Sequence, residues 1–308
     1  MPYNPVTDSA ALVALRANIA RLAMDNFEET PDYKQILREI PIDESFAKDF
    51  QRFQTMVGFG AAKEWQDGSS AESDSISFGP YKDLFAVEYA IQTTFERKLP
   101  KLQKYDVMGK IGAQGGYSLN LALNQLSAIV ADNGTVTTYH KDAESVALLS
   151  ASRVTHGEGA ASWNNIISSN AALSYAALQD LFVVAQSVTN LRGHPLPRYM
   201  PIRIMVTPTK MNTAKALIKN PAQHGTTDRN ISTFFNELTY DVNRYMTQPN
   251  YWYAFAKDWN IVIGFLQKFR TKVWTNDDTE SIKYRADMWF LHGLMDQAYG
   301  VYGSTGAA

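Results

Sequence analysis

The C-terminal segment, residues 274 to 304, constrains the possible folds of this chain most strongly. Residues 274 to 289 predict a strand, an acidic turn at residues 277 to 280 and a second strand. Gly293-Leu-Met-Asp296 and Gly300-Val-Tyr-Gly-Ser304 then give the segment a glycine-rich end. No reactive side chain stands where chemistry would require one. The pattern therefore indicates that this segment has a structural role and not a catalytic one.

The composition is that of an ordinary folded protein. Of the 308 residues, 45% are hydrophobic and 19% are charged, which is sufficient for a substantial core in two domains or one large one. The chain has 29 Lys and Arg residues against 31 Asp and Glu residues, so its formal net charge is -2. Because there is no chain-wide basic field to hold a phosphate backbone at physiological salt, the charge argues against direct reading of nucleic acid.

The chain has no cysteine, which excludes disulfides, thiolate zinc sites, iron–sulfur clusters and cysteine nucleophiles together. Such a chain suits assembly in a reducing cytoplasm. The longest apolar runs, such as residues 181 to 185 and 261 to 266, are far shorter than the roughly twenty residues that a membrane span needs. Residues 1 to 5 lack a basic region followed by an apolar stretch, so we expect neither a signal peptide nor a membrane anchor.

The N-terminal region predicts one helix followed by an extended arm. Residues 8 to 24 have helical periodicity, with Asp8 as the N-cap and one apolar face made of Leu12, Leu15, Ile19 and Leu22. The charged segment that follows is interrupted by Pro31 and Pro41 and has little core of its own. We expect this arm to lie against a surface outside itself.

Residues 56 to 95 predict a long two-stranded excursion. Its first part, from Gly58 to Ser75, is polar, small and rich in turn formers. Strict alternation follows from Phe85 to Thr93, which is typical of a strand. An excursion whose tip has few apolar residues to bury serves either as a lid or as a contact between subunits.

The rest of the chain predicts mixed helices and strands. Glycines precede a helix at about residues 117 to 131, and we expect them to form a hinge or tight turn into it: Gly109, Gly112, Gly115 and Gly116. Short strands and loops are expected from 135 to 170, a helix from about Ser174, a strand at 203 to 206 and a helix from Thr209. Strand patterns return after Tyr251. This order favours an α+β fold over a doubly wound sheet.

Motifs that could carry chemistry are weak. The glycines of residues 109 to 116 suggest a phosphate loop, but their spacing does not match GxxxxGK[ST]. The histidines show no i, i+4 pair and no HExxH motif, so each is predicted to be a loop or surface residue: His140, His156, His194, His224 and His292. Asp277, Asp278 and Glu280 could hold calcium, although an exposed acidic turn needs no metal. No GxSxG motif is present. We expect no catalytic residue, no metal site and no cofactor.

Aromatic residues are concentrated between Tyr251 and Trp259, where Trp252, Tyr253 and Phe255 also lie. Such a cluster can form a sugar-binding platform or a packed interface. Core packing is the default interpretation for most of these side chains.

Four stretches, taken in order, resemble the tailed-bacteriophage major capsid proteins of the Hong Kong ninety-seven type, and more closely their Mu-type major head subunit branch. The first is Leu119-Asn-Leu-Ala-Leu-Asn-Gln-Leu126, and the second runs from Asp142 to Ser150 with His156 and Asn164 or Asn165. The third combines residues 172 to 178, 192 to 193, 201 to 208 and 214 to 218. The fourth is Gly293 to Asp296 with Gly300 to Ser304. The family's usual arginine before the terminal glycine–valine–tyrosine is Tyr299 here, and its aspartate–glycine pair is Asp142-Ala143.

The resemblance implies an N-terminal arm at residues 1–55 and an extended β-hairpin loop at 56–95. It further implies a peripheral domain with a long spine helix at 96–145 and 255–308, and an axial domain at 146–254. Contacts between subunits are expected at Lys63, Trp65, Tyr81, Lys82, Phe85, Leu12 and Leu15. No asparagine or activating carboxylate can be matched to a cross-link through Lys63 or Lys82, so none is predicted.

The implied function is that of a major capsid protein, not an enzyme. Copies would assemble in the host cytoplasm into hexamers and pentamers of an icosahedral virion shell around double-stranded DNA, without sequence-specific binding. Scaffold, portal and cement proteins are possible partners, and no membrane is involved. The alternatives are an encapsulin-like nanocompartment shell, a carbohydrate-binding or hydrolytic protein that uses the aromatic cluster, and a decoration or tail component of a virion.

Overall fold

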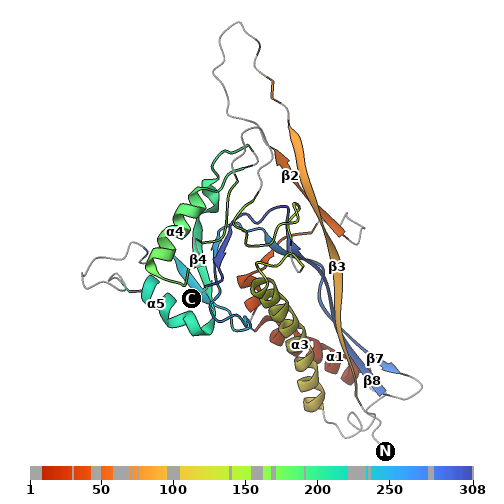
Figure 1. The fold of residues 1–308 in the computed structure, drawn as a ribbon. Coiled ribbons are helices and arrows are strands. Elements are labelled where there is room, and N and C mark those ends of the chain that lie inside the picture. The colour runs from red at the N-terminus through yellow and green to blue at the C-terminus, as the bar shows by residue number, and fades with distance from the viewer. Residues whose placement is uncertain are drawn as a thin grey trace, which may run out of the picture. The chain divides into compact units, whose positions relative to one another are not determined.

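The computed structural model describes residues 9–29, 31–42, 50–57, 70, 73–74, 76–95, 105–138, 141–153, 162–167, 171–190, 192–220, 234, 237–276 and 281–306. Helices and strands are mixed along the chain (Figure 1), which confirms the predicted α+β class. The α-helices are α1 (Ser9–Glu28), α3 (Tyr105–Asp132), α4 (Tyr175–Gln186) and α5 (Met211–Ile218), and the short 3₁₀ helices are η1 (Asp32–Gln35), η3 (Pro197–Tyr199) and η4 (Pro208–Lys210). The strands are β1 (Arg38–Glu39), β2 (Phe50–Val57), β3 (Ser77–Phe95), β4 (Pro201–Val206), β5 (Thr239–Val242), β6 (Trp252–Ala256), β7 (Ile261–Asn276), β8 (Ser281–Leu294) and β9 (Val301–Ser304).

The chain divides into two compact units. The first collects residues 1–49, 85–127 and 263–292, and the second collects 50–84, 128–262 and 293–308. The strands form one sheet with the order β1-β7-β8-β3-β2 and another with the order β5-β4-β6-β9. Because each unit is built from segments far apart in the sequence, neither can form from one continuous stretch of chain.

A long antiparallel strand pair forms the sheet part of the first unit. Residues 86–95 of β3 pair with residues 291–282 of β8 in unbroken register. Tyr284 of β8 is buried and donates its hydroxyl hydrogen to the Gly112 carbonyl of α3 at 3.1 Å. α3 therefore packs against this face of the pair. The strands predicted at 85 to 93 and on either side of the acidic turn are confirmed, while the turn itself lies outside the described residues.

The predicted hinge before residue 117 is wrong, because its glycines lie inside α3. A Cβ on Gly116 would overlap the carbonyl of Ala23 in α1, and one on Gly112 would lie 2.5 Å from the Ile19 side chain. A Cβ on Gly115 would lie 2.6 Å from the Tyr284 ring. The glycines are therefore needed for the close approach of α3 to α1 and β8, and they do not break the helix.

Buried amide side chains of α3 fix the end of α1 and the residues that follow it. Asn120 donates from Nδ2 to the Phe27 carbonyl at 2.6 Å, and Asn124 accepts from the Tyr33 backbone N–H at 2.7 Å. The two asparagines also bond to each other at 2.6 Å. They satisfy backbone groups that would otherwise be buried without a partner. This explains why two asparagines stand in the largely apolar stretch Leu119 to Leu126.

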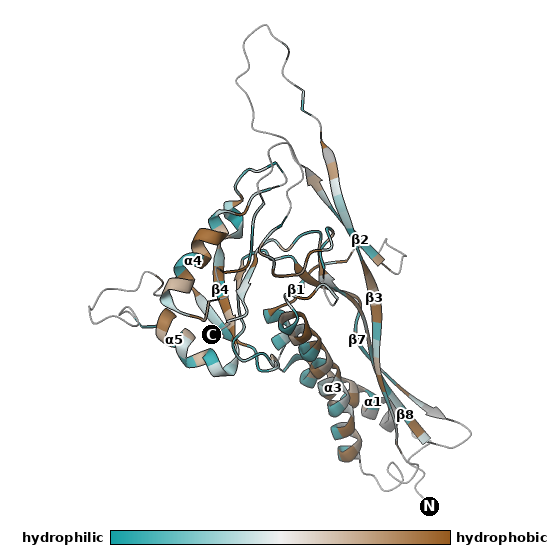
Figure 2. Cartoon of the chain, viewed as in Figure 1, coloured by the Kyte–Doolittle hydropathy of each residue, from teal (hydrophilic) through white to brown (hydrophobic). Residues whose placement is uncertain are grey.

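The second unit has helices packed on a mixed sheet. β4 runs parallel to β5 and antiparallel to β6, and β6 is antiparallel to β9. α4, α5 and β4 lie close together in Figure 1, and Figure 2 shows both apolar and polar residues along α4. Their apolar side chains share one buried core, which includes Leu178, Leu181, Ile204, Leu217 and Trp252. The helix predicted from Ser174 is confirmed, with the Ser174 side chain accepting from the Ala177 N–H as its N-cap.

A buried ion pair organises the irregular segment of the second unit. Arg153 donates from Nη1 to Asp142 Oδ2 at 2.5 Å, and both side chains are almost completely buried. The same guanidinium donates to the carbonyls of Ala147 and Leu148 and, through Nε, to Asn165 Oδ1. All three nitrogens of the guanidinium have partners, which such a deeply buried charge requires. Burial nevertheless lowers the pKa of Arg153 from its ordinary value, and Asp142 opposes this.

Planar groups stack in one column from this ion pair toward the surface. The Arg153 guanidinium lies 5.3 Å from the centre of the Trp163 ring, and the Trp163 ring stacks on Tyr299 at 5.3 Å. Tyr299 stacks in turn on Tyr199 at 5.1 Å, and the Arg198 guanidinium lies 4.6 Å from the centre of the Tyr199 ring. Cation–π and offset-stacked contacts are both favourable. The column thus includes Tyr299, the residue that departs from the family pattern.

Candidate assembly surface

β2 and the first part of β3 form a hairpin, defined here as residues 50–57 and 76–84 of the second unit. The strands are neighbours in the sheet. They run in opposite directions, because Arg52 on β2 bonds to Asp83 whereas Gln54, further along β2, bonds to the earlier residue Gly79. Two antiparallel strands are thus present where the excursion was predicted at residues 56 to 95, but the first strand begins at Phe50, and residues 86–95 pair with β8. Residues 58 to 69, which contain Lys63 and Trp65, lie outside the described residues.

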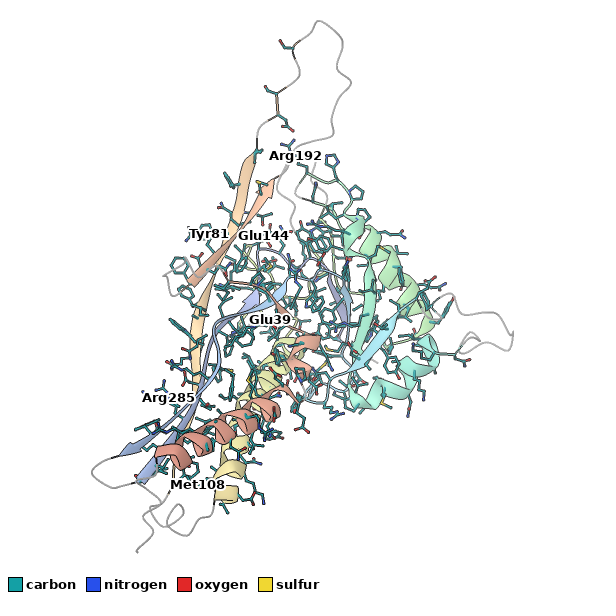
Figure 3. All side chains as sticks on the ribbon, turned by 180° about the vertical axis from the view of Figure 1, so that it is seen from behind. Glu39, Tyr81, Met108, Glu144, Arg192 and Arg285 are labelled. Carbon is teal, nitrogen blue, oxygen red and sulfur yellow. The ribbon has the colours of Figure 1, made fainter. Side chains whose placement is uncertain are left out.

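Arg52, Tyr81 and Asp83 form a cluster on one face of the hairpin. The guanidinium makes a two-pronged ion pair with Asp83, at 2.7 Å from Nε and from Nη2, and lies 4.0 Å from the centre of the Tyr81 ring. The hydrogen bond from Arg52 holds the pKa of Asp83 below its ordinary value, and the same bond raises the pKa of Arg52. Because the group is exposed, this pairing orders the hairpin surface more than it stabilises the fold. Figure 3 labels Tyr81, which lies on β3.

The opposite face of the hairpin is anchored to the second unit near Leu84. The Leu84 side chain is buried, and a Cβ on Gly293 would come within 2.8 Å of it. Gly293 has a φ of +148°, which favours glycine on its own account. Thr55 donates its hydroxyl hydrogen to Asp296 Oδ2 at 2.5 Å. The glycine–aspartate segment of the C-terminus therefore positions the base of the hairpin.

Large apolar side chains on and next to the hairpin are exposed. Phe78 is 70% exposed and Phe85, the next residue after the hairpin on β3, is 64% exposed. Met56, Ile76 and Tyr81 are also exposed. Single exposed apolar residues are normal on a protein surface, but a run of large ones along one strand marks an interaction site. The surface has the chemistry of a docking face.

The other residues expected at intersubunit contacts lie on β3 and in α1. Lys82 is half-buried, and its pKa is lowered by burial and by the neighbouring Lys141. Leu12 and Leu15 lie in α1, but their side chains are outside what the structure describes. The structure therefore brings Tyr81, Lys82 and Phe85 onto one strand. Sequence reasoning missed Phe78 and Met56, although both could have been found as apolar residues at the ends of a predicted polar loop.

A metal site is not supported by the described residues. They hold no group of three or more His, Asp or Glu side chains that could bind a metal ion. His194 is in an exposed loop as predicted, but the prediction is wrong for His292, which lies in β8 and is largely buried. His140, His156, His224, Asp277, Asp278 and Glu280 are outside the described residues. No helix among those residues is long and apolar enough to cross a membrane.

The aromatic cluster from Tyr251 to Trp259 packs mainly inside the second unit. Trp252, Tyr253 and Phe255 are buried on β6, and the Arg203 guanidinium lies over the rings of Phe255 and Trp259. Buried rings cannot stack on a sugar, so the core interpretation holds for these three.

A hollow of about 340 Å³ lies in the first unit, and sequence reasoning did not find it. It is lined by Met24, Phe27, Tyr33, Lys34, Phe265, Lys268, Phe269 and their neighbours.

The fold has counterparts among solved structures, although no protein-family model and no curated protein matches the sequence. The capsid of Ralstonia phage GP4 matches with a TM-score of 0.57 at 12% identity, over 87% of this chain and 86% of that one. The capsid structure of the Cyanophage P-SCSP1u gives 0.54 at 10% identity, over 87% and 85%. A virus-like particle from Pyrococcus furiosus gives 0.52 at 12% identity, over 94% and 98%. The chain therefore has the fold of phage capsid proteins of the Hong Kong ninety-seven type.

Proposed function

We propose that this chain is a major capsid protein, whose copies assemble into hexamers and pentamers of an icosahedral shell around double-stranded DNA. The observation that carries the proposal is the shared fold, which extends over more than four fifths of this chain and of each capsid chain compared. The exposed apolar hairpin supports it, because such a surface is covered when a neighbouring copy binds. Heterologous contacts that close into rings are how identical subunits build a shell.

For the assembled shell we propose an N-terminal arm at residues 1–55, an extended loop at 56–95, a peripheral domain at 96–145 and 255–308, and an axial domain at 146–254. The order of the four resembling stretches supports a place in the Mu-type branch. Intersubunit contacts are proposed at Lys63, Trp65, Tyr81, Lys82, Phe85, Leu12 and Leu15. For Tyr81 and Phe85 the support is their exposure.

The partners follow from the same proposal. Packaged DNA would contact the inner surface of the shell without sequence-specific binding. The net charge of -2 supports this, because a slightly acidic protein does not bind DNA tightly, and tight binding would oppose packaging. Scaffold, portal and cement proteins are further partners, and no membrane takes part. The protein would be located in the virion after assembly in the host cytoplasm, and we propose no enzymatic activity for it.

A nanocompartment shell is the second candidate, because the virus-like particle from Pyrococcus furiosus matches over 94% of this chain. The two candidates differ in what the shell encloses. A phage shell would carry DNA when it matures, whereas a nanocompartment would carry protein.

The test is negative-stain microscopy with light scattering on the purified chain, expressed alone and with any scaffold encoded beside it. Rings or closed polyhedral particles are expected. The ratio of absorbance at 260 and 280 nm, read before and after nuclease treatment, then distinguishes protected DNA from protein cargo. A monodisperse monomer or dimer in both expressions would contradict the shell function.

A further inference from the structure

A bidentate ion pair ties Asp74, which stands just before the second strand of the hairpin, to another segment of the second unit. Arg192 donates from Nη1 to Asp74 Oδ2 at 2.9 Å and from Nη2 to Asp74 Oδ1 at 3.0 Å. Asp74 stands just before β3 begins at Ser77. Arg192, labelled in Figure 3, follows α4 by a few residues. The pair therefore joins two parts of the chain that are 118 residues apart.

The loop that carries Arg192 is built as a defined turn. The side-chain oxygen of Asn190 accepts from the backbone N–H groups of Arg192 and His194, each at 2.9 Å. Gly193 has a φ of +80°, a conformation that favours glycine, and Thr189 pairs with Pro195 across the base of the loop. The backbone of Arg192 is thus held in place by its own turn, and a defined position leaves less entropy to lose when the ion pair forms.

The segment between Asp74 and Leu84 is consequently held at both of its ends. Leu84 packs beside Gly293 at one end, and Asp74 bonds to Arg192 at the other. The exposed apolar residues Ile76, Phe78 and Tyr81 lie between these anchors. Pairing with β2 already orders this strand, and the ion pair adds an anchor just before the strand begins, so its apolar side chains stay presented in one arrangement.

We propose that the Asp74–Arg192 pair is a strap that pre-organises the apolar hairpin surface for binding to a second copy of this chain. The assembly role rests on the proposed shell function, whereas the ordering role concerns the single subunit. A pre-organised surface binds more tightly because less conformational freedom is lost on association. Both side chains are partly exposed, 25% for Arg192 and 39% for Asp74, so the strap is weak and sensitive to salt.

The test uses unassembled subunits and follows hydrogen exchange of the backbone amides of residues 76–84. Asp74→Asn and Arg192→Gln each remove one charge of the ion pair and leave a polar, uncharged side chain in its place. Exchange in this segment should rise about two- to fivefold in both variants, which is the range expected for a partly exposed pair. The double variant Asp74→Arg with Arg192→Asp reverses the charges and should bring exchange back toward that of the wild type. Arg244→Gln, which removes an exposed arginine of the same unit, serves as control.

The same variants are then compared in an assembly reaction followed by light scattering. Asp74→Asn and Arg192→Gln should slow assembly, and the charge-reversed pair should recover at least part of the rate. Unchanged exchange in both single variants would overturn the strap. Raised exchange with an unchanged assembly rate would overturn its role in binding. If the wild type forms no particles, the shell function fails, and the exchange data still decide whether the strap exists.

Discussion

The guanidinium of Arg153 is a buried charge whose loss would be costly. It balances the Asp142 carboxylate where water has no access and also satisfies the carbonyls of Ala147 and Leu148. A buried charge without its partner is strongly unfavourable, whereas a buried pair adds little net stability. The importance of the pair therefore lies in the cost of removing one partner, which leaves the other charge buried and unpaired.

Arg153→Met is expected to lower the free energy of unfolding by about 3–5 kcal/mol, because Asp142 is left buried and unpaired. Urea titration of the unassembled subunit measures it. Arg21→Met is the matched control: the Arg21–Asp25 pair is well exposed, so its loss should cost no more than about 1 kcal/mol. Adding Asp142→Leu to Arg153→Met should recover part of the loss. Equal unfolding midpoints for wild type and Arg153→Met would contradict this account.

The burial of His292 predicts that the folded protein loses stability in acid. Burial lowers the pKa of His292 from 6.5 to about 4. Because the unfolded chain binds the proton more readily, the stabilisation is complete above pH 6.5 and is lost as the pH falls toward 4. The loss attributable to this residue is up to about 3 kcal/mol. Unfolding titrations at several pH values should show a smaller loss in His292→Phe, and an identical pH profile in both proteins would rule out the proposed cause.

At the scale of elements, the packing of α3 against α1 is set by glycines. The periodicity of residues 8 to 24 predicted α1, and that of 117 to 131 predicted the second half of α3. The first half was not predicted, because glycine lowers helix propensity and clusters of it usually mark turns. What stabilises these turns of α3 is contact with Ile19, Ala23 and Tyr284, which no local pattern can show.

The glycines are expected to differ in their tolerance of alanine. A Cβ at position 116 would overlap the Ala23 carbonyl, a backbone atom that cannot move without shifting α1, so Gly116→Ala should destabilise the subunit by about 1–3 kcal/mol. A Cβ at position 109 would meet only side-chain ends, that of Leu22 at 3.1 Å and that of Asn18 at 3.9 Å. Gly109→Ala should therefore be neutral or stabilising by up to about 1 kcal/mol. Thermal unfolding compares the two, and equal melting temperatures would show that close packing is not the reason for the glycines.

At the scale of the whole molecule, the fold class was predictable and the details of the surface were not. Helical and alternating patterns gave the order of elements, and the resemblance of four short stretches gave the fold. The exposure of Phe78 was missed, since an apolar residue in a strand pattern is normally assigned to a core. The burial of His292 was missed for the converse reason, because a polar residue is normally assigned to the surface.

Phe78→Ser tests the hairpin in assembly without changing the folded subunit. Phe78 is 70% exposed, so the melting temperature of the subunit should change little. If a neighbouring copy covers the ring, its loss removes about 1.5–3 kcal/mol from each contact, and the concentration needed for assembly should rise about tenfold or more. Phe78→Leu keeps most of the apolar surface and should lie between the wild type and Phe78→Ser. Static light scattering across a concentration series provides the measurement.

The last strand of the smaller sheet has a consequence for how the protein is made. β9 is fully buried and pairs with β6, and Asn165 donates to the carbonyl of Val301. The sheet of the second unit thus lacks one of its strands until residues 301–304 have left the ribosome. A nascent chain shorter than this leaves the edge of β6 uncovered, and unpaired strand edges attract other chains. Synthesis itself therefore sets the earliest moment at which this unit can close.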